Sequence, residues 1–477
     1  MFWGAFSPNP ALTVSSLVLI PVIWLLLWRR AEPPVLAFAC GMQWFQAAAL
    51  IFHDNSRGTV LGGDVTLPEL AQASWLSLIG VLAVTVGMRL ALIGSKPLSS
   101  LAIKKEALNL APPRLFLAYI ICFLAGTVLE RFTYSYAGLT QAFYGLFNLK
   151  WLPAFLLAYA VLVRQTHYRL LAIVVAIEFG SGLLGLFSTF KSVLFVLLVV
   201  FLGVQGLKDR ASWGPPFVIA AALFVSLLVW TAIKGDYRSF LSQESGQQQV
   251  LVSVPQRIEK LTDLLRSLDV KQLPDALDNS IQRLACVELF ANCIRTVPAS
   301  VPYEHGALWL GAIERVFMPR LIFPNKVGVD DSERARHYTG LEISGAEQGT
   351  SISMGYMAES YVDFGPWLMF IPVLLLGVFY GLIYRILANH GPSRLLGLAV
   401  AGTILAFGAN TIETSNIKLI GINTANFLVL GLIYWRFGRY FMDYIREISS
   451  RSEPRTRPIP PTLPPSRLAK SRGPAEH

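Results

Sequence analysis

Charged residues are scarce in this chain. Asp, Glu, Lys and Arg make up 15% of its 477 residues and hydrophobic residues 54%, whereas a soluble globular domain is roughly a quarter charged. Apolar windows of about 20 residues, the length that crosses a bilayer, recur between Ala11 and Phe437. Together these observations exclude an ordinary soluble enzyme and predict an all-α, polytopic membrane helical bundle.

Cysteines and cofactor motifs are scarce as well. The four cysteines make no disulfide framework, and no Cys-x-x-Cys or His-x-x-x-His pattern predicts zinc. Cys286 and Cys293 lie seven positions apart on an expected helix, which leaves open whether they are bonded. The chain also lacks a Walker A sequence, a Gly-rich dinucleotide turn, a Gly-x-Ser-x-Gly elbow and a His-Glu-x-x-His sequence. We therefore expect no cofactor, no metal ion and no ATP hydrolysis.

Eleven windows bounded by charge or proline are predicted to be membrane helices. They lie near residues 11–28, 33–52, 70–94, 115–129, 150–163, 170–188, 190–207, 215–233, 366–384, 394–412 and 417–435. The windows divide the membrane bundle into residues 1–233, with eight spans, and residues 366–437, with three. The fourth and fifth windows are short for a bilayer, so we expect their aromatic flanks to extend them or to lie in the membrane interface.

Basic residues divide unevenly between alternate connections of these helices. One set of connections holds twelve of them: Arg29, Arg30, Lys96, Lys104, Lys105, Arg114, Arg164, Arg169, Lys208, Arg210, Arg385 and Arg394. The alternate short connections hold five: Arg57, Arg131, Lys150, Lys191 and Lys418. Because cytoplasmic loops are rich in Lys and Arg, we predict an N-terminus outside and a C-terminus in the cytoplasm. This topology also explains the net charge of +10 without a nucleic-acid partner.

Two polar segments lie outside the windows. Residues 438–477 are basic, and six prolines between Pro454 and Pro465 forbid a helix there. We expect this segment to be a disordered cytoplasmic tail. Residues 234–365 form a large loop that the charge pattern places outside, and this loop carries more than half of the acidic residues in the chain.

The large loop contains two stretches with helical spacing of apolar residues, so we expect two amphipathic helices. They are marked by Ile258, Leu261, Leu265 and Leu268 in the first stretch, and by Ile281, Leu284 and Leu289, after Pro274, in the second. From Pro298 onward several prolines interrupt this spacing. We expect an irregular stretch there, tethered over the helical bundle.

The loop also places basic residues in compact local settings: Lys234, Arg238, Arg283, Arg320 and Lys326. A guanidinium next to a proline is oriented, and its planar fork can bind two phosphate oxygens, while a lysine supplies a point charge. Lys234 and Arg238 could equally be snorkelling residues that end a span. Arg320 and Lys326 lie far from any span end, so we interpret them as ligand-binding residues.

Glu359 is the most informative carboxylate in the chain. It lies seven residues before the ninth window, among Met and Tyr residues. Partial desolvation there would raise its pKa and suit it to accept a proton, although a carboxylate favoured by a helix dipole is an equal alternative. Asp363 lies nearer the window and is interpreted as such a cap.

Three other ionisable groups lie within or beside predicted spans. Glu178 lies inside the sixth window, where an ionisable residue is functional or is bonded to a neighbouring helix. Glu413 and Lys418 flank a turn on the outer side, so they could pair with each other.

Three segments around these residues resemble one family of membrane enzymes. Pro319-Arg-Leu-Ile-Phe-Pro-Asn-Lys326, Gly349-Thr-Ser-Ile-Ser353 and Glu359-Ser-Tyr-Val-Asp-Phe-Gly365 resemble the Wzy-type oligosaccharide repeat-unit polymerases of O-antigen and exopolysaccharide synthesis. The resemblance covers mainly residues 234–384, with the span count and the one large loop. Pro366 follows where that family more often has a second glycine, and an odd number of spans is not its commonest layout.

This resemblance implies a glycosyltransferase at the outer face of a bacterial inner membrane. Such an enzyme transfers a growing glycan from undecaprenyl diphosphate to a new lipid-linked repeat unit. Glu359 is then the expected base, and Arg283, Arg320 and Lys326 the expected cations for the departing diphosphate, with Lys234 and Arg238 as further substrate-binding residues. The implied partners are lipid-linked oligosaccharides, membrane lipids, and a flippase and chain-length regulator of the same pathway.

Two other functions remain compatible with the sequence. A glycan ligase would use the same donor with another acceptor, and only the identity of that acceptor separates the two. A transporter or lipid flippase is the alternative without chemistry. Transporters commonly contain two related halves with broken helices in matching positions, whereas here the long loop follows eight windows and has no counterpart in the first half.

Overall fold

The computed structural model describes residues 4–446 except 5, 30–31, 134–139, 186–188, 206–213, 244–249, 270, 272, 285, 319–321, 324, 327 and 346–349. The regular secondary structure of the described residues is helical, apart from one isolated antiparallel β-bridge between Leu110 and Arg446. The predicted tail begins inside the last helix, and its residues 447–477 lie outside the described part.

Eight helical segments are long and apolar enough to cross a bilayer. They are α2 (Pro10–Leu27), α3 (Val35–Ser56), α4 (Leu70–Ala91), Pro112–Leu129 of α6 (Pro112–Thr133), the run Phe143–Arg164 that ends in α8 (Trp151–Arg164), α11 (Gly214–Leu241), α18 (Phe370–Asn389) and α20 (Asn416–Ile445). Two shorter apolar helices are α10 (Lys191–Gln205) and α19 (Arg394–Gly408). The chain is therefore an all-helical, multi-pass membrane protein.

Every predicted apolar window coincides with a helix, the sixth with α9 (Tyr168–Leu183). The boundaries differ most at α11 and α20, which continue to Leu241 and Ile445, beyond the predicted ends at 233 and 435. A helix continues through polar residues wherever its backbone hydrogen bonds continue, so an apolar window ends too early. Lys234 and Arg238 consequently lie on α11 and not in the loop that follows it.

The polar segment between α11 and α18 folds into six helices among its described residues. They are α12 (Val254–Arg266), α13 (Leu273–Leu284), α14 (Val287–Thr296), α15 (Ala307–Val316), α16 (Asp331–Thr339) and α17 (Tyr356–Leu368). The first predicted amphipathic helix is α12, whereas the second stretch forms two helices, α13 and α14. The expectation of an irregular stretch after Pro298 is wrong for α15 and α16.

The start of the ninth window also differs from the prediction. Residues Pro366–Leu368 belong to α17, and α18 begins only at Phe370. Gly365 has φ +70°, a conformation that favours glycine, and it interrupts the helical backbone within α17. Proline is tolerated directly after such a break because its missing N–H would have no helical partner there.

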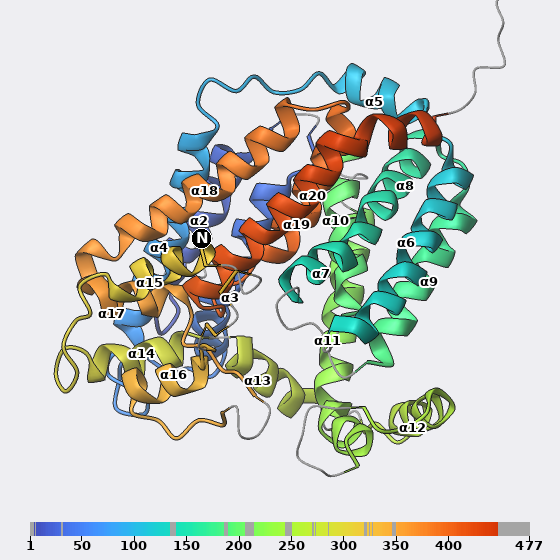
Figure 1. The fold of residues 1–477 in the computed structure, drawn as a ribbon. Coiled ribbons are helices and arrows are strands. Elements are labelled where there is room, and N and C mark those ends of the chain that lie inside the picture. Colours follow the sequence, from blue (N-terminus) through green and yellow to red (C-terminus); the bar gives the residue numbers. More distant parts are fainter. Residues whose placement is uncertain are drawn as a thin grey trace, which may run out of the picture.

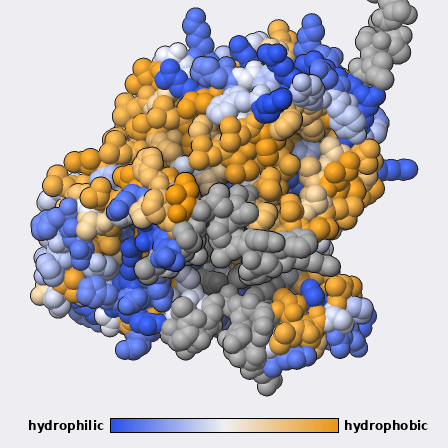
Figure 2. All heavy atoms as spheres, in the orientation of Figure 1, coloured by the Kyte–Doolittle hydropathy of each residue, from blue (hydrophilic) through white to orange (hydrophobic). Residues whose placement is uncertain are grey.

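The surface of the bundle is hydrophobic in the middle and polar at the two ends. α5 (Ser100–Leu108) and the end of α20 lie at one end, and α12, α13, α14 and α16 gather at the other (Figure 1). On the face drawn in Figure 2, hydrophobic atoms cover the middle of the bundle, and hydrophilic atoms cover the region of α5 and that of α14 and α16. This distribution fits a bundle whose middle lies in lipid.

Three of the twelve basic residues that the sequence assigned to one side bind backbone or side-chain groups at the same end of the bundle. Arg29 donates to the carbonyl oxygen of Ser95 (3.1 Å), Arg114 to that of Arg446 (2.8 Å) and Arg385 to that of Ala91 (3.1 Å). We call this end the basic end, and the end formed by α12–α17 the loop end.

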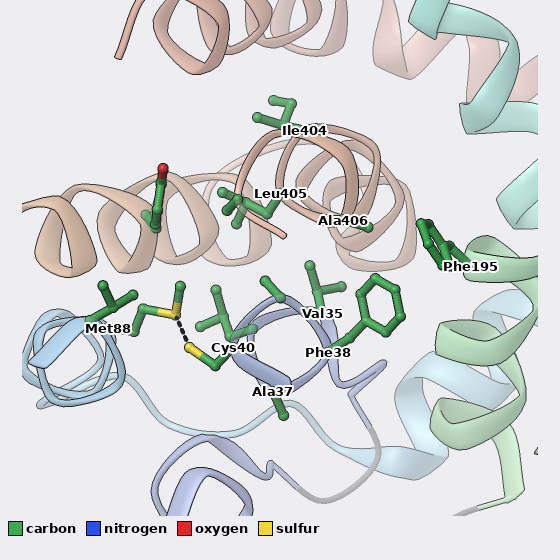
Figure 3. Close-up of a cluster of buried hydrophobic side chains, with 14 of the residues drawn as sticks. Val35, Ala37, Phe38, Cys40, Met88, Phe195, Ile404, Leu405 and Ala406 are labelled. Carbon is green, nitrogen blue, oxygen red and sulfur yellow. Dashed lines mark hydrogen bonds between the residues drawn. The ribbon is translucent and has the colours of Figure 1, made fainter. Parts of the chain in front are cut away.

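One part of the apolar core surrounds the start of α3. Its residues Val35, Phe38 and Cys40 lie between α4, α10 and α19, which contribute Met88, Phe195 and Ile404–Ala406 (Figure 3). The rings of Phe38 and Phe195 meet edge to face with centroids 5.2 Å apart.

The helices α4 and α18 pack backbone to backbone. A Cβ at Gly87 would collide with the carbonyl oxygen of Leu374, and one at Gly377 with that of Val84. Small residues permit this close approach between membrane helices. The contact anchors α18, and with it the preceding α17, to the first half of the chain.

Candidate functional site

The helix that carries Glu359 is fixed at both faces of its first turn. The N–H of Tyr356 donates to the carbonyl oxygen of Thr414 (3.0 Å), and its hydroxyl donates to Oε1 of Gln43 in α3 (2.7 Å). Gly355 precedes the helix with φ +89°, and a Cβ there would collide with the carbonyl oxygen of Ile412. The start of α17 is thus held against α3 and the α19–α20 turn.

This anchoring buries Glu359 at the N-terminus of α20. The residue is 1% exposed, its Oε2 accepts a hydrogen bond from the backbone N–H of Asn416 (2.7 Å), and its Oε1 lies 3.9 Å from Nη1 of Arg334. Burial raises the pKa of Glu359 to about 8, although the Asn416 N–H and the Arg334 charge lower it. Asp331 and Asp363 raise this pKa further.

A second carboxylate, Asp331, lies beside Glu359 at the start of α16. It is 2% exposed, and its Oδ2 is 2.7 Å from Nζ of Lys418 and 3.2 Å from Oγ of Ser415. Lys418 also donates to Oγ of Ser351 (2.9 Å). Lys418 therefore forms an ion pair with Asp331, where the sequence suggested Glu413.

We call Asp331, Arg334, Glu359, Asn416 and Lys418 the loop-end polar cluster. Four of its atoms are buried and have no hydrogen-bond partner among the described residues: Oδ1 of Asp331, Nη1 of Arg334, and Oδ1 and Nδ2 of Asn416. A buried polar atom without a partner costs about 1 to 3 kcal/mol, and such atoms are rare in folded proteins. Their concentration beside one carboxylate marks this cluster as the candidate site.

Asp363 has a structural role in the same helix. Its two carboxylate oxygens accept hydrogen bonds from the backbone N–H groups of Leu308 (3.0 Å) and Trp309 (2.8 Å), at the start of α15. Burial raises the pKa of Asp363, and these two N–H groups oppose the shift. Asp363 is a cap, as the sequence suggested, but it caps α15 and not the following span.

Among the predicted cations, Lys326 has described contacts, and they lie at the end of α15. The ammonium group of Lys326 donates to the carbonyl oxygens of Arg315 (2.6 Å) and Met318 (2.8 Å), so it binds the end of α15. Lys234 and Arg238 lie half-buried on α11, which packs on α10, α12 and α13. Arg320 lies outside the described residues, as does the side chain of Arg283 on α13.

Sequence reasoning missed the roles of Asp331, Arg334 and Asn416. Asp331 and Arg334 show only the pattern of a helix start, since Asp330 caps α16 through the N–H groups of Ser332 and Glu333. The sequence around Asn416 does not indicate its role, because its backbone N–H binds Glu359, which is distant in the chain. Lys418 was noticed, but its partner was not.

The sequence also highlighted Glu178, Cys286 and Cys293, and the structure describes the surroundings of each. Glu178 accepts a hydrogen bond from the Tyr119 hydroxyl (3.0 Å) and lies 2.7 Å from Nζ of Lys150, so it is bonded to neighbouring helices.

Cys286 and Cys293 are both free and buried. The described residues contain no group of three or more His, Cys, Asp or Glu side chains that could hold a metal ion.

Comparison with known proteins assigns a family. The chain belongs to the family described as a domain of unknown function (DUF8712), whose match covers residues 44–414. The match includes Asp331, Arg334 and Glu359 and ends two residues before Asn416. No curated protein and no solved structure matches the chain.

Proposed function

We propose that this protein is a membrane glycosyltransferase that polymerises undecaprenyl-diphosphate-linked oligosaccharide repeat units into a surface polysaccharide. The observation that carries the proposal is the buried carboxylate of Glu359, whose pKa is raised to about 8, at the loop end of an apolar helical bundle. The likeness of residues 319–326, 349–353 and 359–365 to repeat-unit polymerases supplies the substrate class.

The chemistry requires one base and stabilisation of one leaving group. The acceptor hydroxyl oxygen attacks the anomeric carbon of the donor glycan, and the bond from that carbon to the diphosphate breaks. Glu359, in its ionised form, takes the hydroxyl proton, and a carboxylate with a pKa near the working pH is suited to this step. The diphosphate leaves with its negative charge, which nearby cations stabilise.

Arg334 is the described cation nearest to Glu359 in this proposal, at 3.9 Å. Arg320, from the segment that resembles the polymerases, and Arg283 remain proposed diphosphate ligands, as do Lys234 and Arg238 on α11. Lys326 is a weaker candidate because its ammonium group binds the end of α15.

The proposal includes a topology of eleven spans. It adds α9, α10 and α19 to the eight long apolar segments. In this topology successive spans run alternately towards the basic end and towards the loop end. With the basic end in the cytoplasm, the loop end faces outward from a bacterial inner membrane. Lipid-linked repeat units, membrane lipids, a flippase and a chain-length regulator are the proposed partners.

The test is polymerisation by the purified full-length protein in lipid nanodiscs, supplied with undecaprenyl-diphosphate-linked repeat units. Wild-type protein should convert them into a ladder of longer glycans. Glu359→Gln should lower the rate by roughly 10² to 10⁴-fold, because it keeps shape but cannot accept a proton. The matched control is Glu314→Gln, at an exposed position on α15, which should polymerise normally.

Three outcomes would contradict parts of the proposal. Normal turnover by Glu359→Gln would remove the base assignment. Transfer of the glycan only to a different lipid acceptor would identify a ligase. Movement of intact lipid-linked units across the membrane, with no glycan product from wild-type protein, would identify a transporter.

A further inference from the structure

The loop-end polar cluster contains both donors and acceptors that have no hydrogen-bond partner among the described residues. Nη1 of Arg334 and Nδ2 of Asn416 are donors, whereas Oδ1 of Asp331 and Oδ1 of Asn416 are acceptors, and all four are buried. Asn416 is 0% exposed, so neither end of its side-chain amide has a partner among the described residues. A ligand that satisfies all four atoms must itself both donate and accept hydrogen bonds.

A neighbouring asparagine on α20 provides the contrast. Asn423 is equally buried, and its Oδ1 likewise has no hydrogen-bond partner among the described residues. Its amide nitrogen, unlike that of Asn416, donates to the carbonyl oxygens of Gly408 and Leu419, both at 2.8 Å. Asn423 therefore ties α20 to the end of α19. The side chain of Asn416 makes no such tie, although its backbone N–H holds Glu359 (2.7 Å).

The charges of the cluster favour an uncharged ligand over an anion. Two carboxylates, Glu359 and Asp331, lie within it, and Lys418 is already paired with Asp331 at 2.7 Å. A phosphate in the same place would lie beside the carboxylate of Asp331, which already takes up the charge of Lys418. Hydroxyl groups donate and accept at once, so a polyhydroxylated ligand matches the four atoms without adding charge.

The cluster reaches the surface through its two cations. The side chain of Arg334 is 27% exposed and that of Lys418 is 41% exposed, whereas Asp331, Glu359 and Asn416 are buried. A ligand therefore approaches along Arg334 and Lys418, towards the carboxylate of Glu359. This approach leads from the loop end of the bundle inward.

We propose that the side chains of Asn416, Asp331 and Arg334 bind hydroxyl groups of the acceptor saccharide and position one of them against Glu359. The inference rests on the proposed function, because it names the ligand of the same site. Under it, Asn416 is a substrate-binding residue, and the departing diphosphate is bound by other groups.

The experiment uses full-length protein in nanodiscs and, as the probe, the free oligosaccharide released from the lipid-linked repeat unit. Its binding is measured by calorimetry, and its use as an acceptor is measured by initial rates. Asn416→Ala should weaken binding and raise the acceptor KM by about 10- to 100-fold, with kcat changed far less. Glu359→Gln should bind the oligosaccharide normally and lose kcat.

Asn426→Ala is the matched control. Asn426 is another buried asparagine on α20, ten residues further along the helix, which places it about 15 Å away. Its KM and oligosaccharide binding should stay within about twofold of wild type. Thermal unfolding separates binding from structure, because Asn416→Ala removes two unpartnered atoms and should leave Tm unchanged or raise it.

The inference fails if Asn416→Ala binds the oligosaccharide like wild type, if Asn426→Ala loses binding equally, or if wild-type protein does not bind it at all. These results are distinguishable from failure of the proposed function. Oligosaccharide binding that depends on Asn416, without polymer formation by wild type, would overturn the polymerase and retain the saccharide-binding role of Asn416. Polymer formation by wild type, with an unchanged acceptor KM in Asn416→Ala, would overturn the role of Asn416 and retain the polymerase.

Discussion

The two ends of the bundle each bury a glutamate, and the two differ in how completely they are bonded. At the basic end, Glu32 accepts hydrogen bonds from the Leu98 N–H (2.7 Å) and the Tyr384 hydroxyl (2.6 Å), and its Oε2 lies 3.2 Å from Nε of Arg29. At the loop end, Glu359 has the Asn416 N–H and a more distant arginine.

This difference separates a structural carboxylate from a candidate reactive one. The bonds of Glu32 join the α2–α3 connection to α18 and to the segment before α5, so both of its oxygens serve the fold. Glu359 lies among four polar atoms that have no partner in the described part of the chain. Strained or unsatisfied groups persist in proteins mainly where function requires them.

The largest effect that tests this comparison is on stability. Glu32→Gln leaves the buried Arg29 without its carboxylate and should lower the free energy of unfolding by about 3 to 5 kcal/mol. At pH 5, where the folded protein holds Glu359 protonated, Glu359→Gln should change it by about 1 kcal/mol or less, because glutamine then replaces a neutral group of the same shape. Thermal unfolding of both variants in one detergent measures the contrast, and equal losses would erase the distinction between the two ends.

The second test is the pH dependence of stability. The pKa of Glu359 is about 8 in the folded protein, above its ordinary value of 4.5, so the folded state holds a proton that the unfolded state releases between these values. The free energy of unfolding should therefore fall as pH rises from about 5 to about 8, by about 1.4 kcal/mol for each unit of pKa difference, and then level off.

The Glu359→Gln variant should show a flatter curve over the same pH range. A residual slope would remain from Asp363, whose pKa is raised in the same direction. Wild-type polymerisation should increase with pH over this range, because the ionised carboxylate is the base. Identical stability curves for wild type and variant would mean that the carboxyl group titrates normally.

The smallest effect concerns Lys326. Because its ammonium group binds carbonyl oxygens at the end of α15, Lys326→Ala should cost about 0.3 to 1 kcal/mol of stability and leave the rate per folded molecule unchanged. Lys326→Arg is the control, since it retains the charge at the helix end. A large fall in rate with normal Tm would return Lys326 to the group of substrate-binding residues.

Local sequence was sufficient to place the apolar helices and to single out Glu359. It was insufficient for the partners of Glu359, because Arg334 and Asn416 lie 25 and 57 positions away in the chain. It also gave no sign of the carbonyl oxygens of Arg315 and Met318 that Lys326 binds at the end of α15. The sequence likewise gave no sign of the role of Glu32 at the basic end, because its partners Leu98 and Tyr384 are distant in the chain.

The sequence by itself determined that this is a multi-pass helical membrane protein, because apolar length and the distribution of charge are properties of single segments. It also determined that a carboxylate precedes α18 in apolar surroundings. Only the tertiary structure decided that α16, α17 and α20 meet around that carboxylate. Side-chain hydrogen bonding and burial depend on which distant segments pack together, and no single segment contains that information.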